Sequence, residues 1–133
     1  MATFSFELVA PERVLFSGDV DAVVLPASEG DMTVMPGHAP MMTALKTGFL
    51  IITDRPGNGR RVLVRGGFAD VNQRGLTVLA ERALPEEEIT QDILDHEILQ
   101  AEMAYDSTND PAAKHAAESA VAQLREAKAA LNF

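Results

Sequence analysis

The spacing of apolar residues changes at Pro85, and this change constrains the fold more than any other feature of the sequence. Before Pro85, short apolar runs are separated by turn residues at intervals of about 8–12 positions, and several runs alternate apolar with polar side chains. After Pro85, apolar residues recur every three to five positions, which is typical of an amphipathic helix. The sequence therefore predicts an all-β sandwich over residues 1–85, followed by an α-helical hairpin over residues 86–133.

The predicted strands are short and rich in β-branched and aromatic residues, and Gly or Pro marks most of the turns between them. Residues 54–59 are expected to form a hairpin loop, because Pro56-Gly57 and Asn58-Gly59 supply turn conformations. Ser17-Gly18-Asp19 predicts another turn, and Gly66-Gly67 predicts a bulge or a sheet corner. The expected strands cover residues 3–9, 13–16, 20–25, 31–35, 41–45, 49–53, 61–65, 68–71 and 76–80.

The predicted hairpin begins with the acidic run at residues 86–88, which suits the positive end of a helix dipole. A first helix of about twenty residues is expected to end near residues 107–110. Pro111 then opens a second helix, with Asn109 or Asp110 as its N-cap. The second helix is rich in alanine, and small side chains allow two antiparallel helices to approach closely.

The net charge of −9 is unevenly distributed along the chain. Residues 1–84 carry eight Lys/Arg against nine Asp/Glu, whereas residues 85–133 carry three against eleven, a net charge of −8. Binding of nucleic acid is not expected, because phosphate contacts require a basic face. No apolar run approaches the roughly 18 residues of a membrane span, so direct insertion into a membrane is not expected either.

Catalytic and cofactor-binding patterns are absent from the sequence. The three histidines, His38, His96 and His115, fall in three different predicted elements, and none lies beside a nucleophile. Cysteine is absent, which excludes disulfides and thiolate metal sites. Gly66-Gly67 is not followed by a predicted helix, so it does not indicate a phosphate-binding loop. The sequence predicts no catalytic residue, cofactor or metal.

Residues 29–40 contain two glycines and two prolines, which predicts a rigid corner rather than a slack loop. Glu29 and Asp31 give this corner an acidic edge. Four methionines, at positions 32, 35, 41 and 42, surround it. Their flexible thioether side chains fit either an adaptable docking surface or an irregular core, and the sequence does not choose between the two.

These motifs together resemble the epsilon subunit of bacterial F-type ATP synthases. The resemblance covers the whole chain, and its most specific part is a Pro-Gly-His-Ala-Pro run followed downstream by Gly-Gly-Phe. The matching segments are Phe16-Ser17-Gly18, Ser28-Glu29-Gly30-Asp31, Pro36-Gly37-His38-Ala39-Pro40, Thr43-Ala44-Leu45-Lys46-Thr47-Gly48, Arg65-Gly66-Gly67-Phe68-Ala69-Asp70-Val71 and Leu76-Thr77-Val78-Leu79-Ala80-Glu81.

The resemblance implies a non-catalytic rotor subunit in the central stalk of a proton-translocating ATP synthase. The sandwich would dock on the gamma subunit and on the membrane c ring, and the hairpin would reach toward the alpha and beta subunits. The location implied is peripheral, on the cytoplasmic face of the bacterial inner membrane. The residues expected to contact gamma and the c ring, by resemblance, are Glu29, Gly30, Asp31, His38, Met41 and Met42.

The sequence departs from the family in two ways that concern regulation. Many bacterial members bind ATP at an Ile-Asp-x-x-Arg-Ala motif, but here only Ile89 matches, with Thr90, Ile93 and Leu94 at the other positions. We therefore expect no ATP binding. Inhibitory members bring a basic hairpin to an acidic segment of beta, whereas this hairpin carries net −8, which predicts a weak or absent brake on ATP hydrolysis.

Two alternatives of other classes are compatible with the residues. One is a free-standing β-barrel that binds a small molecule and uses the methionine-rich corner as its pocket. The other is an adaptor whose acidic helices bind a basic partner protein.

Overall fold

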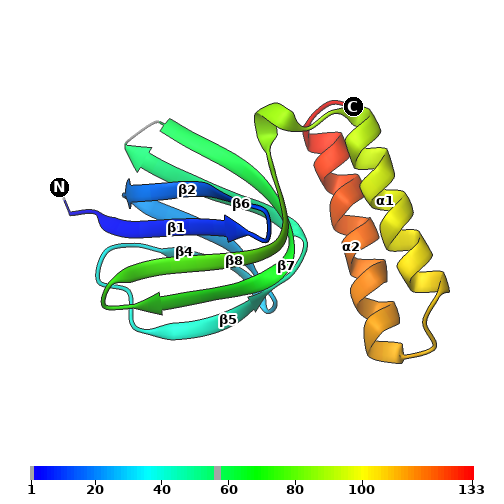
Figure 1. The fold of residues 1–133 in the computed structure, drawn as a ribbon, viewed down its shortest axis with the longest axis horizontal. Helices are drawn as coiled ribbons and strands as arrows, with labels where there is room; N and C mark the ends of the chain where they lie inside the picture. The colour runs from blue at the N-terminus through cyan, green and yellow to red at the C-terminus, as the bar shows by residue number, and fades with distance from the viewer. Residues whose placement is uncertain (1, 56–57) are drawn as a thin grey trace. The chain divides into compact units, whose positions relative to one another are not determined.

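The computed structural model describes residues 2–55 and 58–133, and it divides into two compact units, Met1–Glu86 and Glu87–Phe133. The first unit is a sandwich of eight described strands and the second is a pair of helices (Figure 1). The predicted fold class, a β-sandwich followed by an α-helical hairpin, is confirmed. The strands are β1 (Phe4–Ala10), β2 (Arg13–Val20), β3 (Ala22–Ala27), β4 (Gly30–Val34), β5 (Met41–Leu45), β6 (Gly48–Arg55), β7 (Asn58–Asn72) and β8 (Gly75–Pro85).

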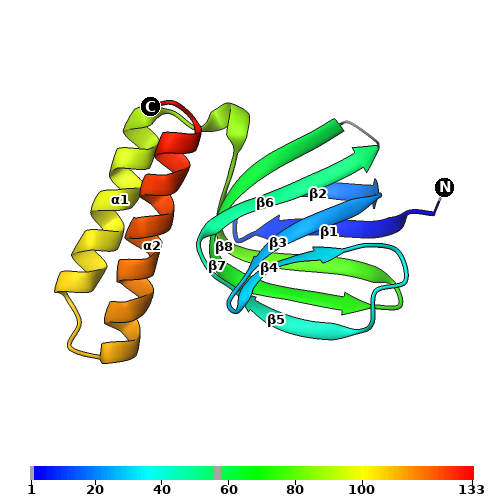
Figure 2. The ribbon, with the colours of Figure 1, turned by 180° about the vertical axis from the view of Figure 1, so that it is seen from behind.

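The strands form two layers that are joined through β7. One layer runs in the order β2-β1-β8-β7-β5, with β1 parallel to β8, and the other contains β4, β3 and β6 (Figures 1 and 2). The first part of β7, residues 58–64, pairs with β6, and its second part, residues 67–71, pairs with β5. A single strand therefore belongs to both layers.

The core of the sandwich lies between the two layers. Alternate side chains point inward, as the predicted period of two requires. Phe6 and Leu8 on β1 are fully buried, as are Val23 and Leu25 on β3 and Leu50 on β6. The inward positions of β7 and β8 add Val62, Val64, Ala69, Val71, Leu76, Val78 and Ala80 to the same cluster.

The glycine pair at 66–67 bends β7 without interrupting it. The register between β7 and β8 is the same on both sides of the pair, with Arg65 opposite Arg82 and Gly67 opposite Ala80. The predicted bulge is therefore wrong, and the alternative of a sheet corner is correct. Gly67 has a φ of +129°, and a Cβ at this position would collide with the carbonyl oxygen of Leu79. Only glycine allows β7 to turn here and keep its pairing with β8.

Ser17, Gly18 and Asp19 belong to β2 and do not form the predicted turn. Gly18 pairs with Phe6 on β1, and the Phe16 ring lies 5.6 Å from the Phe6 ring. The chain changes layer later, at Asp21, whose amide donates to the carbonyl of Thr53. The predicted 54–59 loop does join β6 to β7, and Arg55 pairs with Asn58. Its Pro56-Gly57 turn lies outside the described residues.

The helices are α1 (Gln91–Asp106) and α2 (Pro111–Ala130). The predicted acidic helix start is wrong, because residues 86–88 form a separate 3₁₀ turn, η1, and α1 begins only after Thr90. The Thr90 hydroxyl accepts a hydrogen bond from the amide of Ile93 at 3.2 Å, as an N-cap does. Asp110 caps α2 by accepting from the amide of Ala112, which confirms one of the two predicted caps. Among the described residues, neither helix is long and apolar enough to span a membrane.

Each of the three basic residues of the helical unit contacts α1 from α2. Lys128 pairs with Asp95 at 2.7 Å, and Arg125 pairs with Glu102 at 3.5 Å. Lys114 donates to the carbonyl of Tyr105 at 2.9 Å, and its ammonium lies 4.1 Å from the centre of the Tyr105 ring. These contacts run along the helix pair and hold the two helices together.

Candidate partner-binding surfaces

Residues 29–40 do not form a single corner. Strand β4 occupies the middle of the stretch, with the β3–β4 turn before it and the β4–β5 loop after it. Five residues of strand at about 3.3 Å each separate the two by about 16 Å. The predicted contact residues therefore fall on two surfaces, which we call the acidic tip (residues 28–31) and the loop end (residues 35–42).

The acidic tip is a tight and well-anchored turn. Gly30 has a φ of +132° and pairs with Ala27 across the turn. The amide of Ser28 donates to the carbonyl of Ala44 at 3.0 Å, and the amide of Lys46 donates to the carbonyl of Pro26 at 2.9 Å. The tip is thus fastened to the end of β5. Glu29 and Asp31 are exposed on it.

The loop end contains the other predicted residues. The amide of His38 donates to the carbonyl of Met35 at 3.1 Å, and its Nδ1 donates to the carbonyl of Ala39 at 2.8 Å. Met41 is half-buried and packs on the core, whereas the Met42 side chain is 70% exposed. Met32 also packs on the core and Met35 is exposed, so the four methionines divide between core filling and surface.

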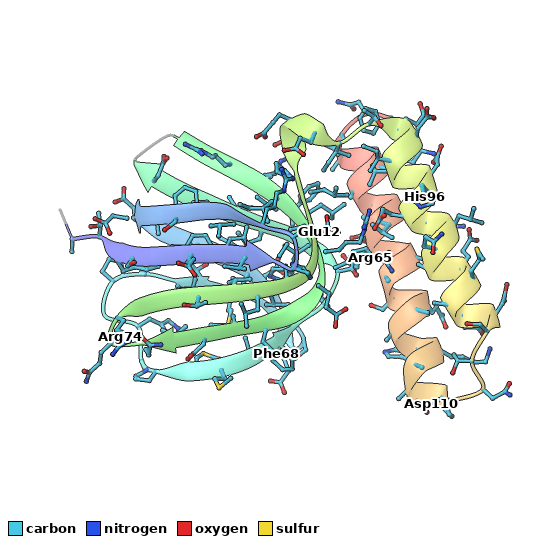
Figure 3. All side chains as sticks on the ribbon, viewed as in Figure 1. Glu12, Arg65, Phe68, Arg74, His96 and Asp110 are labelled. Carbon is cyan, nitrogen blue, oxygen red and sulfur yellow. The ribbon has the colours of Figure 1, made fainter. Side chains whose placement is uncertain are left out.

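An exposed apolar surface of the sandwich was not predicted from the sequence. Five residues on the outer face of the β2-β1-β8-β7-β5 layer lie opposite one another in the strand register, and we call them the apolar row. Three of them are large and more than half exposed: Val14 at 58%, Phe68 at 58% and Leu79 at 56%. Figure 3 shows Phe68 on the sheet. In order across the strands, the row is Val14, Val9, Leu79, Phe68 and Ala44.

A signal for the apolar row exists in the sequence. The run Val78-Leu79-Ala80 is apolar at every position, so one of its residues must point away from the core. In the structure, Val78 and Ala80 are buried and Leu79 is the exposed one. A shallow hollow beside Leu79 is lined by Val9, Pro11 and Phe68. The row only becomes a surface when the five strands are placed in register.

The positions of the family's ATP-binding motif have structural roles in this chain. Thr90 caps α1, while Ile89 and Leu94 are buried. Ile93, the residue at the arginine position of the motif, is half-buried. None of these four side chains is charged, so none of them can form a charge-assisted hydrogen bond to a phosphate group.

Comparison with known proteins gives consistent results. The family described as "ATP synthase, Delta/Epsilon chain, beta-sandwich domain" matches residues 3–86. The ATP synthase epsilon chain of Parvibaculum lavamentivorans is 47% identical over 115 residues, which cover 86% of this chain and 87% of that one. The epsilon chain of Jannaschia sp. is 43% identical over 118 residues, 89% of each chain.

Two solved structures have the same fold. A chain in the structure of the Euglena gracilis mitochondrial ATP synthase, described as OSCP/F1/c-ring, has a TM-score of 0.75 and 27% identity, and covers 98% of this chain and 82% of its own. A chain from the Tetrahymena thermophila mitochondrial ATP synthase, described as central stalk/c-ring, has a TM-score of 0.69 at 16% identity, covering 93% of this chain and 95% of its own.

Proposed function

The chain belongs to the ATP synthase epsilon-chain family, and from this premise we propose that it is a non-catalytic rotor subunit that joins gamma to the membrane c ring. The proposal places it peripherally, on the cytoplasmic face of the bacterial inner membrane. The Euglena relative, which is 27% identical, comes from an assembly that contains F1 and the c-ring. The relatives favour this interpretation over a free-standing small-molecule-binding barrel or a general adaptor.

The apolar row is the observation that carries the proposal. Val14, Phe68 and Leu79 are each more than half exposed on the outer face of the sheet, where a lone protein would leave them in water. Burial of a large apolar side chain contributes about 1.5–3 kcal/mol, so this row supplies the apolar centre that a stable protein interface needs. We assign the apolar row to gamma.

The acidic tip is the proposed contact with the c ring. Glu29 and Asp31 are exposed on a turn that is hydrogen-bonded to the end of β5, so their carboxylates are held at one edge of the sandwich. Exposed charges of this kind contribute mainly to the register and rate of docking. His38, Met41 and Met42 lie beyond the other end of β4 and are assigned to gamma.

The helical unit is proposed to stay folded and to restrain ATP hydrolysis weakly or not at all. Its three basic residues are engaged between α1 and α2, which leaves its remaining surface acidic. An acidic segment of beta would be repelled by that surface. The positions of the ATP-binding motif carry apolar or hydroxyl side chains, so we expect this chain not to bind ATP. Calorimetry with ATP at millimolar concentration tests this expectation.

A matched pair of leucines tests the assignment to gamma. Leu79 on the apolar row and Leu99 on α1 are 56% and 52% exposed, so a change to Asp buries no charge at either site. Leu79→Asp is expected to abolish co-purification with gamma, and Leu99→Asp is expected to leave it intact. The reverse result would favour the adaptor alternative, in which the helices bind the partner.

A further inference from the structure

A hollow of about 530 Å³ lies beside the loop end of the sandwich. Three segments line it: residues 3–5 at the start of β1, residues 34–38 and 40 from the end of β4 to the start of β5, and residues 71–75 around the β7–β8 turn. Phe4, Met35 and Val71 contribute apolar surface, and Arg74 and His38 contribute groups that can be cationic. The hollow is therefore amphiphilic.

The charge of this hollow is opposite to that of the chain. None of the described residues that line it is acidic, although the whole chain has 20 Asp and Glu. Asp70 accepts a hydrogen bond from Asn72 at 3.5 Å but does not line the hollow. Arg74 is exposed at the β7–β8 turn, and its guanidinium forms no ion pair with any residue that the structure describes (Figure 3).

The walls of the hollow are held in place by hydrogen bonds and close packing. The amide of Arg74 donates to the side-chain carbonyl of Asn72 at 2.8 Å. Gly75 has a φ of +134°, and a Cβ there would collide with the carbonyl oxygen of Ser5, so the turn is packed directly on β1. Because the His38 Nδ1 donates to the carbonyl of Ala39, its Nε2 is the nitrogen left for a ligand. A preformed site of this kind loses little entropy on binding.

We propose that the hollow receives an acidic segment of gamma, whose carboxylate pairs with Arg74 while a neighbouring apolar side chain packs on Phe4 and Met35. This inference rests on the proposed function. Arg74 closes the β7–β8 hairpin, and the same two strands carry Phe68 and Leu79, so the hollow continues the surface already assigned to gamma. The apolar row supplies affinity, and the Arg74 pair fixes the orientation of the sandwich on gamma.

Two charge reversals test the hollow against a general effect of charge. Lys46 is the control, because it also forms no side-chain ion pair with a described residue but follows β5 at the end of that strand away from the hollow. Binding of the full chain to isolated gamma is measured by calorimetry at low salt. Arg74→Glu is expected to raise the Kd about tenfold or more, and Lys46→Glu to change it less than about twofold.

A crosslinking experiment identifies the partner residue. Arginine does not react with carbodiimide-activated carboxylates, whereas lysine forms an amide with them. The Arg74→Lys variant is therefore mixed with gamma and a carbodiimide. We expect mass spectrometry to find a crosslink from residue 74 to an Asp or Glu of gamma. The wild-type chain should give no crosslink from this position.

The possible failures are distinguishable. If the wild-type chain does not bind gamma, the proposed function is wrong and this inference falls with it. If the wild-type chain binds and Arg74→Glu binds equally well, or Lys46→Glu weakens binding as much, only the inference about the hollow is overturned. If the Arg74→Lys variant forms the complex but gives no crosslink from residue 74 to gamma, the inference about the hollow is overturned as well.

Discussion

Arg61 holds Glu86 with two hydrogen bonds, from Nη2 to Oε1 at 2.6 Å and from Nε to Oε2 at 3.0 Å. The Arg61 guanidinium also lies 4.8 Å from the centre of the Phe49 ring. This arrangement fastens η1 (Glu86–Glu88) to β7 at the last residue of the sandwich unit. The hydrogen bonds from Arg61 lower the pKa of the Glu86 carboxyl and raise the pKa of the Arg61 guanidinium.

The Glu86 carboxylate is expected to stabilise the sandwich in a pH-dependent way. Because its pKa is lower in the folded chain than in the unfolded chain, the stabilisation is complete above the ordinary carboxyl pKa of about 4.3 and is lost as the pH falls through the folded value. Glu86→Gln should cost less than about 1 kcal/mol at pH 7, since both side chains are partly exposed. Urea unfolding at pH 7 and pH 3 measures the difference.

The two pH values serve as each other's control in this experiment. Arg61 stays protonated throughout, so only Glu86 changes charge within the pair. A cost of Glu86→Gln that is equally large at pH 3 would show that the residue acts through packing and not through its charge.

Gly67→Ala is expected to destabilise the sandwich much more than Gly37→Ala. Both glycines have positive φ, but a Cβ on Gly67 would collide with the Leu79 carbonyl, whereas a Cβ on Gly37 has no atom within 4 Å. The expected costs are roughly 3 kcal/mol or more for Gly67 and about 1 kcal/mol for Gly37. Thermal or urea unfolding compares them, and equal costs would argue against the bend at Gly67.

Asp31→Arg is expected to weaken the coupling of proton flow to ATP synthesis. Reversal of an exposed interface charge costs roughly 0.5–1 kcal/mol, which corresponds to a fall of about two- to fivefold in coupled synthesis by membrane vesicles. Asp19→Arg, at an exposed site on β2, makes the same charge change away from the acidic tip and should have no effect. Unchanged synthesis with Asp31→Arg would contradict the assignment of the tip to the c ring.

Deletion of residues 87–133 is expected to leave ATP hydrolysis by the assembled complex within about twofold of the intact complex, because an acidic hairpin is repelled by an acidic segment of beta. The deletion keeps Glu86, so the contact with Arg61 is retained. Hydrolysis is measured in membranes that contain either chain. A large rise in the rate would show that the hairpin is an effective brake.

The sequence predicted the elements whose signals are local. The strand period located most of the strands, and Asp110 with Pro111 located the start of α2, because each of these depends on neighbouring residues only. The start of α1 was predicted too early because Glu86 has a stronger partner in Arg61, 25 positions away in the chain. Ser17-Gly18-Asp19 has the composition of a turn, but its pairing with β1 outweighs that local preference.

The candidate surfaces depend still more on long-range pairing. Glu29 and Asp31 were predicted from motif resemblance, and the structure adds that they lie at the far end of β4 from His38. The apolar row joins residues from five strands, and the hollow joins three segments that are distant in sequence. No single stretch of sequence contains either surface, so neither was predicted from local patterns.

The membership of β7 in both layers has a mechanical consequence. In a sandwich held together by side-chain packing alone, a tangential load on one layer can make it slide over the other. Here a single covalent strand crosses from the layer of β6 to the layer of β5, and β8 keeps its register along the whole crossing. A twisting force applied at one face therefore meets the stiffness of a continuous backbone, and the body turns as one piece.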